Sequence, residues 1–546
     1  MKVIDQALDA DDIPRAAEYA ERARNQGSRD PLVINLVAWR REEDGRFDEA
    51  VALLREALAI TPDDATLYLG LGSAMRKAGL MKDAVGAFEA AIELDPGYAA
   101  AWFARGSAFN AGGATKDAID DFRQVLRLDP QHDAAMGALA GALAKRGELD
   151  EAALLANRAL ALRPQSRIAS VALAQIAIEQ KRYDDAVAIL EPLAQNGSDS
   201  GDGDDLVAAF SALGDALEGS GAFDQAYEAY QRAQDLFEQV HRARLPSDFI
   251  DPSESMAQMI RELTTIEPRL LAGAHGGVQS PVEHHVILTG YPRSGTTLVE
   301  NILATHPGVV AIEECPTLRG LEPYLTAAGL ERFAQADAGE VERLRADYWE
   351  RASRAANVDL TGKILVDMDP FKGSRLPYIA KLFPEAKVIV MRRDPRDVVW
   401  SCFHTSFGFN TGTLAFTSLE STARHYDLTW QLIFQSLERL PIERFELFYH
   451  RLVRDFDVTT QQLCAFIGIP WSESLRRFDR TAQERGVSTA SAPQVRKGLY
   501  DGTGGWQRYA SQLATVEPIL KPWIDAFESV SNRSDQLPDL GTDAEL

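Results

Sequence analysis

The pattern of apolar and small residues in the first half of the chain repeats every 34 residues. Proline, glycine and alanine recur in one register, each at its own place in the repeat. The recurring positions are Pro62, Pro96, Pro130 and Pro164, Gly45, Gly79, Gly113 and Gly147, and Ala50, Ala84, Ala118 and Ala152. Each repeat therefore predicts a helix, a glycine turn, a second helix in which alanine permits close packing, and a proline that ends it.

This order of elements resembles the tetratricopeptide repeat, so we expect residues 1–241 to form a right-handed α-solenoid of roughly six or seven units with irregular ends. Ala16 and Ala186 continue the register, whereas Ala226 follows Ala186 by 40 residues. The extra length predicts an acidic loop at 196–205, NGSDSGDGDD. The concave surface of such an array is suited to holding an acceptor protein or peptide, and a scaffold or dimerisation role in a homodimer is equally compatible with it.

After the repeats, a helical linker is predicted at 242–283, with a helix near 253–272 and a Gly-, Ser- and Pro-rich end. Short β-branched strands that alternate with helices then predict a three-layer α/β domain with a parallel, P-loop-like sheet at 284–530. A flexible tail is expected at 531–546.

The first strand of this domain, His285–Thr289, leads into the loop Gly290–Thr297 and then into a helix. Such a turn directs backbone N–H groups and a helix N-terminus at one place, which predicts an anion site. The spacing imitates the loop of nucleoside triphosphatases, but Thr296 stands where their lysine would be and the cation is Arg293. A nucleotide kinase or triphosphatase would need that lysine and magnesium ligands, so this alternative is disfavoured.

Two further basic motifs follow. Arg393 comes after the buried strand Lys387–Met391 and precedes Ser401 by eight residues, and Arg496-Lys497-Gly498 precedes a glycine-rich turn. Taken singly, the first motif is explained equally well as a capped surface helix, and a two-residue basic cluster such as the second is usually solvated surface.

In this order the three motifs resemble those of sulfotransferases, over residues 284–525. The resemblance implies 3'-phosphoadenosine 5'-phosphosulfate as co-substrate and no metal ion. It assigns the 5'-phosphosulfate to Arg293, Ser294, Gly295, Thr296 and Thr297, the 3'-phosphate to Arg393, Ser401, Arg496, Lys497 and Gly498, and the adenine to Tyr449.

The strand at 309–315 ends in Glu313-Glu314, a pair that tyrosylprotein sulfotransferases carry at this place. A tyrosine hydroxyl, with a pKa of roughly 10, needs a positioned base before it is a good nucleophile. The resemblance gives this role to Glu314, with Glu313 as the alternative. It also places Ser491, before Gln494-Val495, near the transferring group, although a serine in such a loop is also a common turn residue.

Two positions depart from that family. Met368 occupies the place of a lysine expected near the departing oxygen, which implies a slower enzyme, a substitute such as Lys372, or a different acceptor. Gly505 stands where tyrosylprotein sulfotransferases have a lysine before Trp506. A carbohydrate or small-molecule acceptor, or a non-catalytic adaptor that still binds the nucleotide, therefore remain alternatives to a protein tyrosine sulfotransferase.

Composition adds limits on partners and location. The formal charge of −24 disfavours nucleic-acid binding. Widely separated cysteines and the lack of an apolar leader or membrane-length run predict a cytoplasmic protein without membrane insertion.

Overall fold

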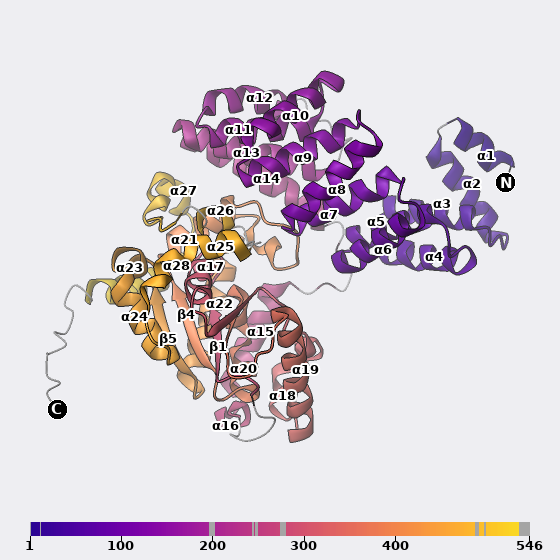
Figure 1. The fold of residues 1–546 in the computed structure, drawn as a ribbon. Helices are drawn as coiled ribbons and strands as arrows, with labels where there is room; N and C mark the ends of the chain where they lie inside the picture. The colour runs from indigo at the N-terminus through magenta and orange to yellow at the C-terminus, as the bar shows by residue number, and fades with distance from the viewer. Residues whose placement is uncertain are drawn as a thin grey trace, which may run out of the picture. The chain divides into compact units, whose positions relative to one another are not determined.

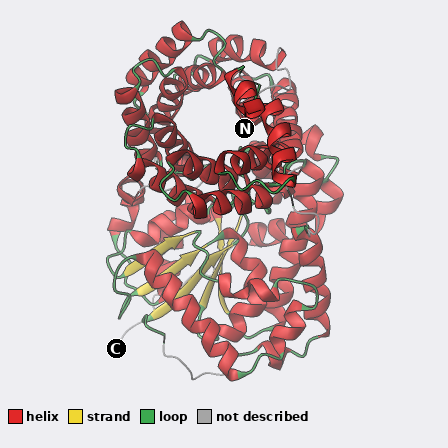
Figure 2. Ribbon diagram, turned by 90° about the vertical axis from the view of Figure 1, so that its right-hand side faces the viewer, coloured by secondary structure: helices red, strands yellow, loops and turns green. Residues whose placement is uncertain are grey.

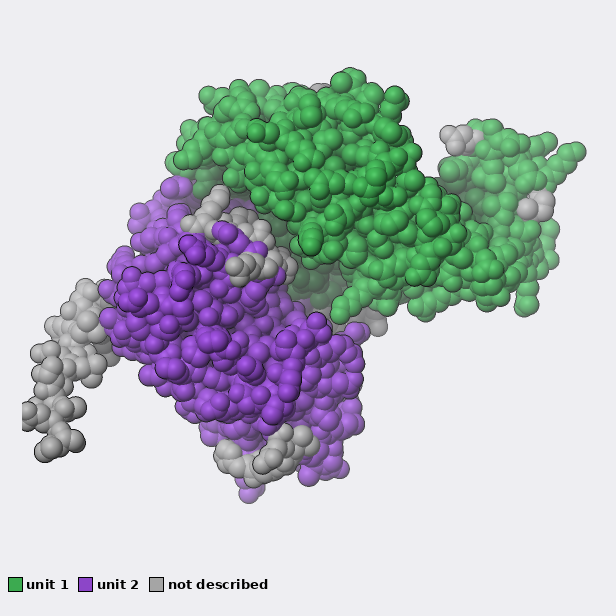
Figure 3. Space-filling model, in the orientation of Figure 1, with its two compact units in different colours: residues 1–249, 406–414 green, residues 250–405, 415–546 purple. Residues whose placement is uncertain are grey.

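The computed structural model describes residues 2–10, 12–195, 203–242, 245, 249, 251–273, 280–485, 491–495 and 498–533. The chain forms two compact units (Figure 3): unit 1 contains residues 1–249 and 406–414, and unit 2 contains 250–405 and 415–546. The units differ from the predicted boundaries in two ways. Residues 250–283, predicted as a linker, belong to unit 2, and residues 406–414, predicted within the catalytic domain, belong to unit 1.

Unit 1 is an array of helices in which each helix packs on its neighbours along the chain. They wind around a common axis, so that Figure 2 shows them as a ring. In chain order they are α1 Lys2–Asp9, α2 Ile13–Asn25, α3 Pro31–Glu43, α4 Phe47–Ile60, α5 Ala65–Lys77, α6 Met81–Leu94, α7 Ala99–Ala111, α8 Thr115–Leu128, α9 Asp133–Arg146, α10 Leu149–Leu162, α11 Arg167–Glu179, α12 Tyr183–Gln195, α13 Gly203–Ser220 and α14 Phe223–Arg242 (Figure 1). The predicted helical solenoid is confirmed.

Close packing within each helix pair explains the small residues of the repeat. Ala84 and Ala118 are fully buried, as the register predicted. Gly72 is equally constrained, because a Cβ atom there would lie 2.4 Å from the Phe88 ring of the paired helix. Gly79 turns the chain between the two helices with a φ of +80°, which favours glycine.

The last helix pair corrects one prediction and adds a segment. Residues 203–205 form the first turn of α13, where acidic side chains favour the helix N-terminus, rather than part of a loop; residues 196–202 of the predicted loop lie outside the described residues. The segment 406–414 packs on this pair. Leu414 is 5% exposed in a cluster with Leu206 and Phe237, and the Phe409 ring stacks on His241 at 4.4 Å.

Unit 2 contains a five-stranded parallel sheet with the order β2-β3-β1-β4-β5. The strands are β1 His284–Thr289, β2 Val309–Glu313, β3 Ile364–Met368, β4 Lys387–Arg392 and β5 Glu443–Phe448. The helical elements are α15 Pro252–Thr265, α16 Pro268–Leu271, α17 Thr296–Ala304, η1 Arg319–Tyr324, α18 Gly329–Ala334, α19 Ala338–Ala356, η2 Pro370–Arg375, α20 Leu376–Leu382, α21 Pro395–His404, α22 Leu419–Arg439, α23 Tyr449–Arg454, α24 Phe456–Ile467, η4 Glu473–Arg477, α25 Phe478–Arg485, α26 Ala492–Val495, η5 Gly505–Tyr509, α27 Ala510–Leu513 and α28 Glu517–Arg533. The short η3, Thr413–Phe416, begins in unit 1 and ends in unit 2. The single helix predicted near 253–272 is divided into α15 and α16, because the residue before Pro268 is extended.

Helices cover both faces of the sheet, which confirms the three-layer α/β prediction (Figure 1). On one face, Val286, Leu288 and Met368 pack on α17 in the main core. On the other face, His285 packs on Tyr348 and Trp349 of α19. Burial on both sides explains why these strands are nearly continuous apolar runs. Ligands of such sheets bind at the carboxyl ends of the strands, where the predicted site residues stand.

Candidate functional site

The loop between β1 and α17 is shaped by two residues with positive φ. Gly295, at +108°, begins α17, and a Cβ atom there would lie 2.8 Å from the Tyr449 ring. Arg293 has a φ of +67°, which is uncommon for a residue with a side chain and is found where a site imposes its own geometry. Ser294, Thr296 and Thr297 are buried beside it. The loop therefore holds a guanidinium group in front of a helix N-terminus, a combination suited to an anion.

The Arg293 side chain connects parts of the chain that are far apart in sequence. Its Nε donates to the Ser401 hydroxyl of α21 at 3.0 Å, Nη1 donates to the Ser491 hydroxyl at 2.5 Å, and Nη2 donates to Gln494 Oε1 at 3.1 Å. Burial, together with the nearby charge of Arg393, lowers the pKa of Arg293 to about 10, so the group is charged at neutral pH. Three residues predicted for the site thus meet at one guanidinium group, and Gln494 joins them.

Arg393 lies next to Arg293. Its Nη1 donates to the Arg293 carbonyl at 2.9 Å, Nη2 donates to the Gly502 carbonyl at 2.5 Å, and its guanidinium lies 4.8 Å from the centre of the Tyr449 ring. The buried Nε of Arg393 has no hydrogen-bond partner among the described residues. Tyr449, the first residue of α23, donates its hydroxyl to the Tyr500 carbonyl at 2.6 Å. Two adjacent arginines, one with a buried donor to spare, fit an anionic ligand.

Asp397 holds the glycine-rich segment after the third basic motif against α21. Its carboxylate accepts the backbone N–H of Gly504 at 2.8 Å and of Trp506 at 3.0 Å. Arg396 covers the Trp506 ring at 4.1 Å. Sequence reasoning missed Asp397, although it stands in the same R-D-P-R-D motif as Arg393. Arg496 and Lys497 lie outside the described residues, so the structure does not place them.

The two arginines lie at a small cavity of about 40 Å³. The residues that line it are Arg293, Gly295, Leu298, Arg393, Tyr449, Ser491, Gln494, Val495, Gly498 and Tyr500. A larger open cavity of about 570 Å³ also has Gly498 in its lining. Ligand pockets of proteins usually have about 300–1,000 Å³. The larger cavity falls within this range, whereas the smaller one is the cavity that the paired arginines line.

The two candidate bases stand at the end of β2. In the sheet, β3 lies between β2 and β1, so these two strands are separated by two strand spacings, or about 10 Å. Because the strands are parallel, the carboxylates and the arginine loop lie at the same edge of the sheet. Glu314 has a φ of +48°, and its backbone N–H donates to the Met368 carbonyl at 2.7 Å. The left-handed backbone of both Glu314 and Arg293 is of the kind that collects at functional sites.

Glu314 is exposed as a residue, yet protein atoms crowd its carboxyl group and disfavour the charged form. This desolvation, with the neighbouring charges of Asp369 and Glu313, raises the pKa of Glu314 to about 7. Glu300, on α17, is buried and also has its pKa raised by desolvation to about 7, while Arg485 opposes the shift. A carboxylate whose pKa lies near neutrality is suited to accept a proton at neutral pH.

The position of the expected lysine is filled by an apolar side chain. Met368 is fully buried in the core between the sheet and α17. Lys372, the suggested substitute, is 3% exposed and donates to Asp367 Oδ1 at 2.5 Å and to the Cys315 carbonyl at 3.4 Å. The lysine is therefore already held by a buried carboxylate, close to the segment that follows Glu314.

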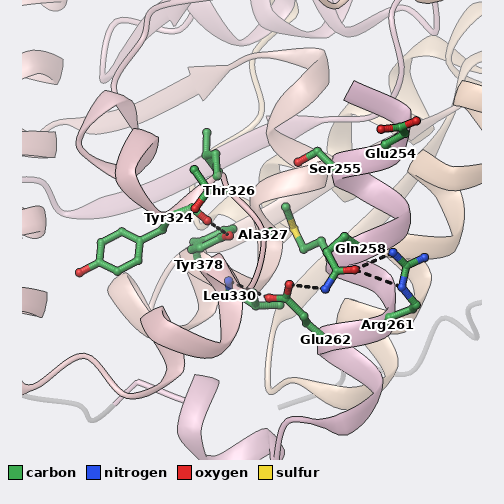
Figure 4. Close-up of a pocket in the computed structure, with 12 residues that line it drawn as sticks. Glu254, Ser255, Gln258, Arg261, Glu262, Tyr324, Thr326, Ala327, Leu330 and Tyr378 are labelled. Atoms are coloured by element: carbon green, nitrogen blue, oxygen red, sulfur yellow. Dashed lines mark hydrogen bonds between the residues drawn. The ribbon is translucent and has the colours of Figure 1, made fainter. Parts of the chain in front are cut away.

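Other features of unit 2 lie apart from this group of residues. A cavity of about 210 Å³ between α15, η1, α18 and α20 is shown in Figure 4. Its Glu262 accepts the backbone N–H of Leu330 at 2.9 Å and the Gln258 side chain at 2.8 Å, so its polar groups satisfy one another. The His404 ring stacks on Trp400 of its own helix.

In the part of the chain that the structure describes, no cluster of histidine, cysteine and acidic side chains has the form of a metal site. No helix there is both long and apolar enough to cross a membrane.

Comparison with protein families confirms both predicted resemblances. Residues 285–473 match the model of the sulfotransferase family. Residues 36–99 and 69–133 match one tetratricopeptide-repeat model, and residues 110–168 and 146–210 match another.

Relatives are distant and match only parts of the chain. An uncharacterized protein of Aquifex aeolicus is 28% identical over 57% of this chain and 41% of its own length. Protein-tyrosine sulfotransferase 1 of Danio rerio is 27% identical over 37% of this chain and 58% of its own length, and the protein of that name from Mus musculus is 31% identical over 21% and 33%. The chain thus spans about half the length of the first relatives.

Among solved structures, a tetratricopeptide repeat protein from Parabacteroides merdae aligns with 44% of this chain and 96% of its own, with 16% identity and a TM-score of 0.36. A thermophilic protein of the same type from Thermus thermophilus covers 34% of this chain and 98% of its own, with 23% identity and a TM-score of 0.29. The chain, by its family matches, joins an array of tetratricopeptide repeats to a segment that matches the sulfotransferase family.

Proposed function

We propose that this protein is a sulfotransferase that moves a sulfuryl group from 3'-phosphoadenosine 5'-phosphosulfate to an acceptor hydroxyl. The observation that carries the proposal is the meeting of Arg293 and Arg393 at one cavity at the carboxyl ends of β1 and β4, with Ser401 hydrogen-bonded to Arg293. The match to the sulfotransferase family over 285–473 supports it.

In the proposed reaction, the acceptor oxygen forms a bond to sulfur as the bond between sulfur and the bridging phosphate oxygen breaks. Arg293 and the backbone N–H groups at the start of α17 stabilise the charge on the transferring group and on the departing adenosine 3',5'-bisphosphate. Arg393 and Ser401, with Arg496, Lys497 and Gly498, hold the 3'-phosphate, and Tyr449 adjoins the adenine. Glu314 accepts the proton of the acceptor hydroxyl, and Ser491 orients Arg293.

For the acceptor, we propose the tyrosine hydroxyl of a protein that the repeat array holds. Support comes from the Glu313-Glu314 pair and from relatives whose names are protein-tyrosine sulfotransferases. A carbohydrate or small-molecule hydroxyl is the second candidate, favoured by the burial of Met368 where a lysine was expected.

The donor site is tested by calorimetric titration with adenosine 3',5'-bisphosphate. Because Arg293 is desolvated among its partners, its replacement in Arg293→Ala should weaken binding by about 2–4 kcal/mol, or roughly 30- to 1,000-fold. Arg424→Ala, which removes an exposed arginine that pairs with Glu420, is the matched control and should bind like the wild type. Equal affinities for all three proteins, or no binding to folded wild type, would contradict the proposed donor site.

The base is tested by transfer of labelled sulfate to a tyrosine-containing peptide pool. In the wild type, kcat/KM should rise with pH to a plateau above about pH 7, because Glu314 must lose its proton to act as base. Glu314→Gln should lower kcat/KM by about 10²–10⁴-fold, while Glu313→Gln keeps most of it. The reverse order would assign the base to Glu313. Binding of the nucleotide without transfer to peptides, carbohydrates or phenols would instead identify a non-catalytic adaptor.

A further inference from the structure

A buried ion pair lies directly behind the candidate base and has no part in the reaction proposed above. Asp367, at the end of β3, is fully buried, and Lys372 of η2 is 3% exposed. Their charged atoms, Oδ1 and Nζ, lie 2.5 Å apart. A buried ion pair contributes little net stability once desolvation is counted, so its presence calls for another explanation.

The pair fixes the chain that follows Glu314. Lys372 Nζ donates to the Cys315 carbonyl at 3.4 Å, and the Thr317 hydroxyl donates to Asp367 Oδ2 at 2.8 Å. Since Cys315 and Thr317 lie one and three residues after Glu314, the pair fastens the chain that follows β2 to the end of β3 and to η2. It thereby supports the left-handed backbone at Glu314, which an isolated chain would disfavour.

A second set of hydrogen bonds, from Tyr348 and His285, holds the carboxylate of Asp367. The Tyr348 hydroxyl donates to Asp367 Oδ2 at 2.9 Å, and the His285 ring lies 2.7 Å from the same hydroxyl. Because the hydroxyl proton goes to Asp367, His285 is the donor to Tyr348 through Nε2. Burial lowers the pKa of His285 to about 4, so the ring is neutral at neutral pH. Asp367 Oδ2 therefore accepts hydrogen bonds from the hydroxyls of Thr317 and Tyr348, and these bonds hold the carboxylate next to Lys372.

The lysine also changes the charge around Glu314. Three carboxylates act on Glu314, namely Asp369, Glu313 and Glu300, and each of them raises its pKa, whereas Lys372 lowers it. Arg485 pairs with Glu300, and Arg375 acts on Asp369, so these two cations balance the outer carboxylates. Without Lys372, Glu314 would hold its proton more tightly and would be ionised only at higher pH.

We propose that Lys372, held by Asp367, is a positioning residue that orients Glu314 and balances the carboxylates around it. This inference rests on the proposed function, since it takes Glu314 as the base. Lys372 acts through Glu314 and its neighbouring backbone, not on the sulfuryl group.

The test compares the pH dependence of transfer in four full-length proteins. Lys372→Met combined with Asp367→Asn removes both charges and leaves no lone buried ion, and Lys372→Arg keeps the charge. Lys521→Met, which removes an exposed lysine paired with Asp525, is the control for a change in net charge. Affinity for adenosine 3',5'-bisphosphate is measured for each protein.

In the double variant, the pH at which kcat/KM reaches half its plateau should move up by about half a unit or more, a roughly threefold loss of rate on the acid side. Lys372→Arg, which keeps the charge, should show a smaller shift than the double variant, and Lys521→Met should match the wild type. Nucleotide affinity should stay unchanged, because the pair does not line the arginine cavity. A loss of rate at every pH without a shift, or no effect at all, would overturn the proposal. A wild type that neither binds the nucleotide nor transfers sulfate would instead refute the proposed function.

Discussion

Gly295 gives the strongest test of the architecture of the arginine loop. The change to alanine adds one methyl group at a backbone φ of +108°, which residues with a side chain rarely adopt. The methyl carbon would lie 2.8 Å from Tyr449 Cδ2 and 3.0 Å from Met391 Cε. The Tyr449 ring cannot retreat freely, because its hydroxyl is bonded to the Tyr500 carbonyl and its face is covered by Arg393.

The expected cost has two parts. A left-handed backbone costs an alanine about 1–2 kcal/mol, and overpacking adds about 1–3 kcal/mol. Gly362→Ala separates them, since Gly362 has a φ of +65° in the same unit but nothing lies within 4 Å of its added methyl group. With about 3 °C lost per kcal/mol, we expect Tm to fall by about 5 °C for Gly362→Ala and about 10 °C for Gly295→Ala.

Scanning calorimetry measures both changes, provided that the transitions of the two units are told apart. Gly72→Ala serves that purpose, because its methyl group meets Phe88 within the repeat array and should lower only the transition of unit 1. Titration with adenosine 3',5'-bisphosphate then shows whether the displaced Tyr449 ring weakens the site. Similar losses of Tm for Gly295→Ala and Gly362→Ala, with unchanged nucleotide affinity, would refute the reasoning.

Three further predictions follow from individual contacts. Ser401→Ala removes the acceptor of the Arg293 Nε bond and should weaken nucleotide binding by about three- to tenfold in calorimetry; a larger loss than that of Arg293→Ala would contradict the geometry. Leu414→Ala should destabilise unit 1, not unit 2, by about 3 kcal/mol, because this side chain is buried against α13 and α14; a lower melting temperature of unit 2 instead of unit 1 would contradict this prediction. Burial lowers the pKa of His285 and of His425 to about 4, so the folded state resists their protonation and the contribution of each histidine to stability falls as pH drops from about 6.5 towards 4. Glu300 and Glu314, whose pKa is raised to about 7, act in the opposite direction, so the wild type is compared with His425→Gln: between pH 7 and pH 5 urea unfolding of the wild type should lose about 2 kcal/mol more than that of the variant, and equal changes would speak against a buried neutral histidine.

Much of the fold follows from local patterns in the sequence. The 34-residue register of Pro62, Gly79 and Ala84 predicts the helix pairs, because turn geometry, helix ends and close packing each require a particular residue type at a particular place. The apolar run from His285 likewise predicts β1, and the glycines after it predict the anion loop. The last helix pair was predicted less well, because the acidic residues 203–205, expected in a loop, form the first turn of α13.

The candidate site was predicted in part. Arg293, Arg393 and Ser401 were identified by the order of their motifs, and the structure brings them together. Gln494 of α26 and Asp397 of α21 were not assigned a role, because the hydrogen-bond partner of each lies far away in the sequence.

The sequence by itself determined the repeat array, the strand–loop–helix order and the residue types available to bind an anion, since these depend on neighbours along the chain. Only the tertiary structure decided that Met368 is core and that Lys372 is held by Asp367 behind Glu314. It also decided that residues 406–414 pack with the repeats. The physical reason is that burial, desolvation and ion pairing arise from segments distant in sequence, so a residue's charge state and role are fixed only when those segments meet.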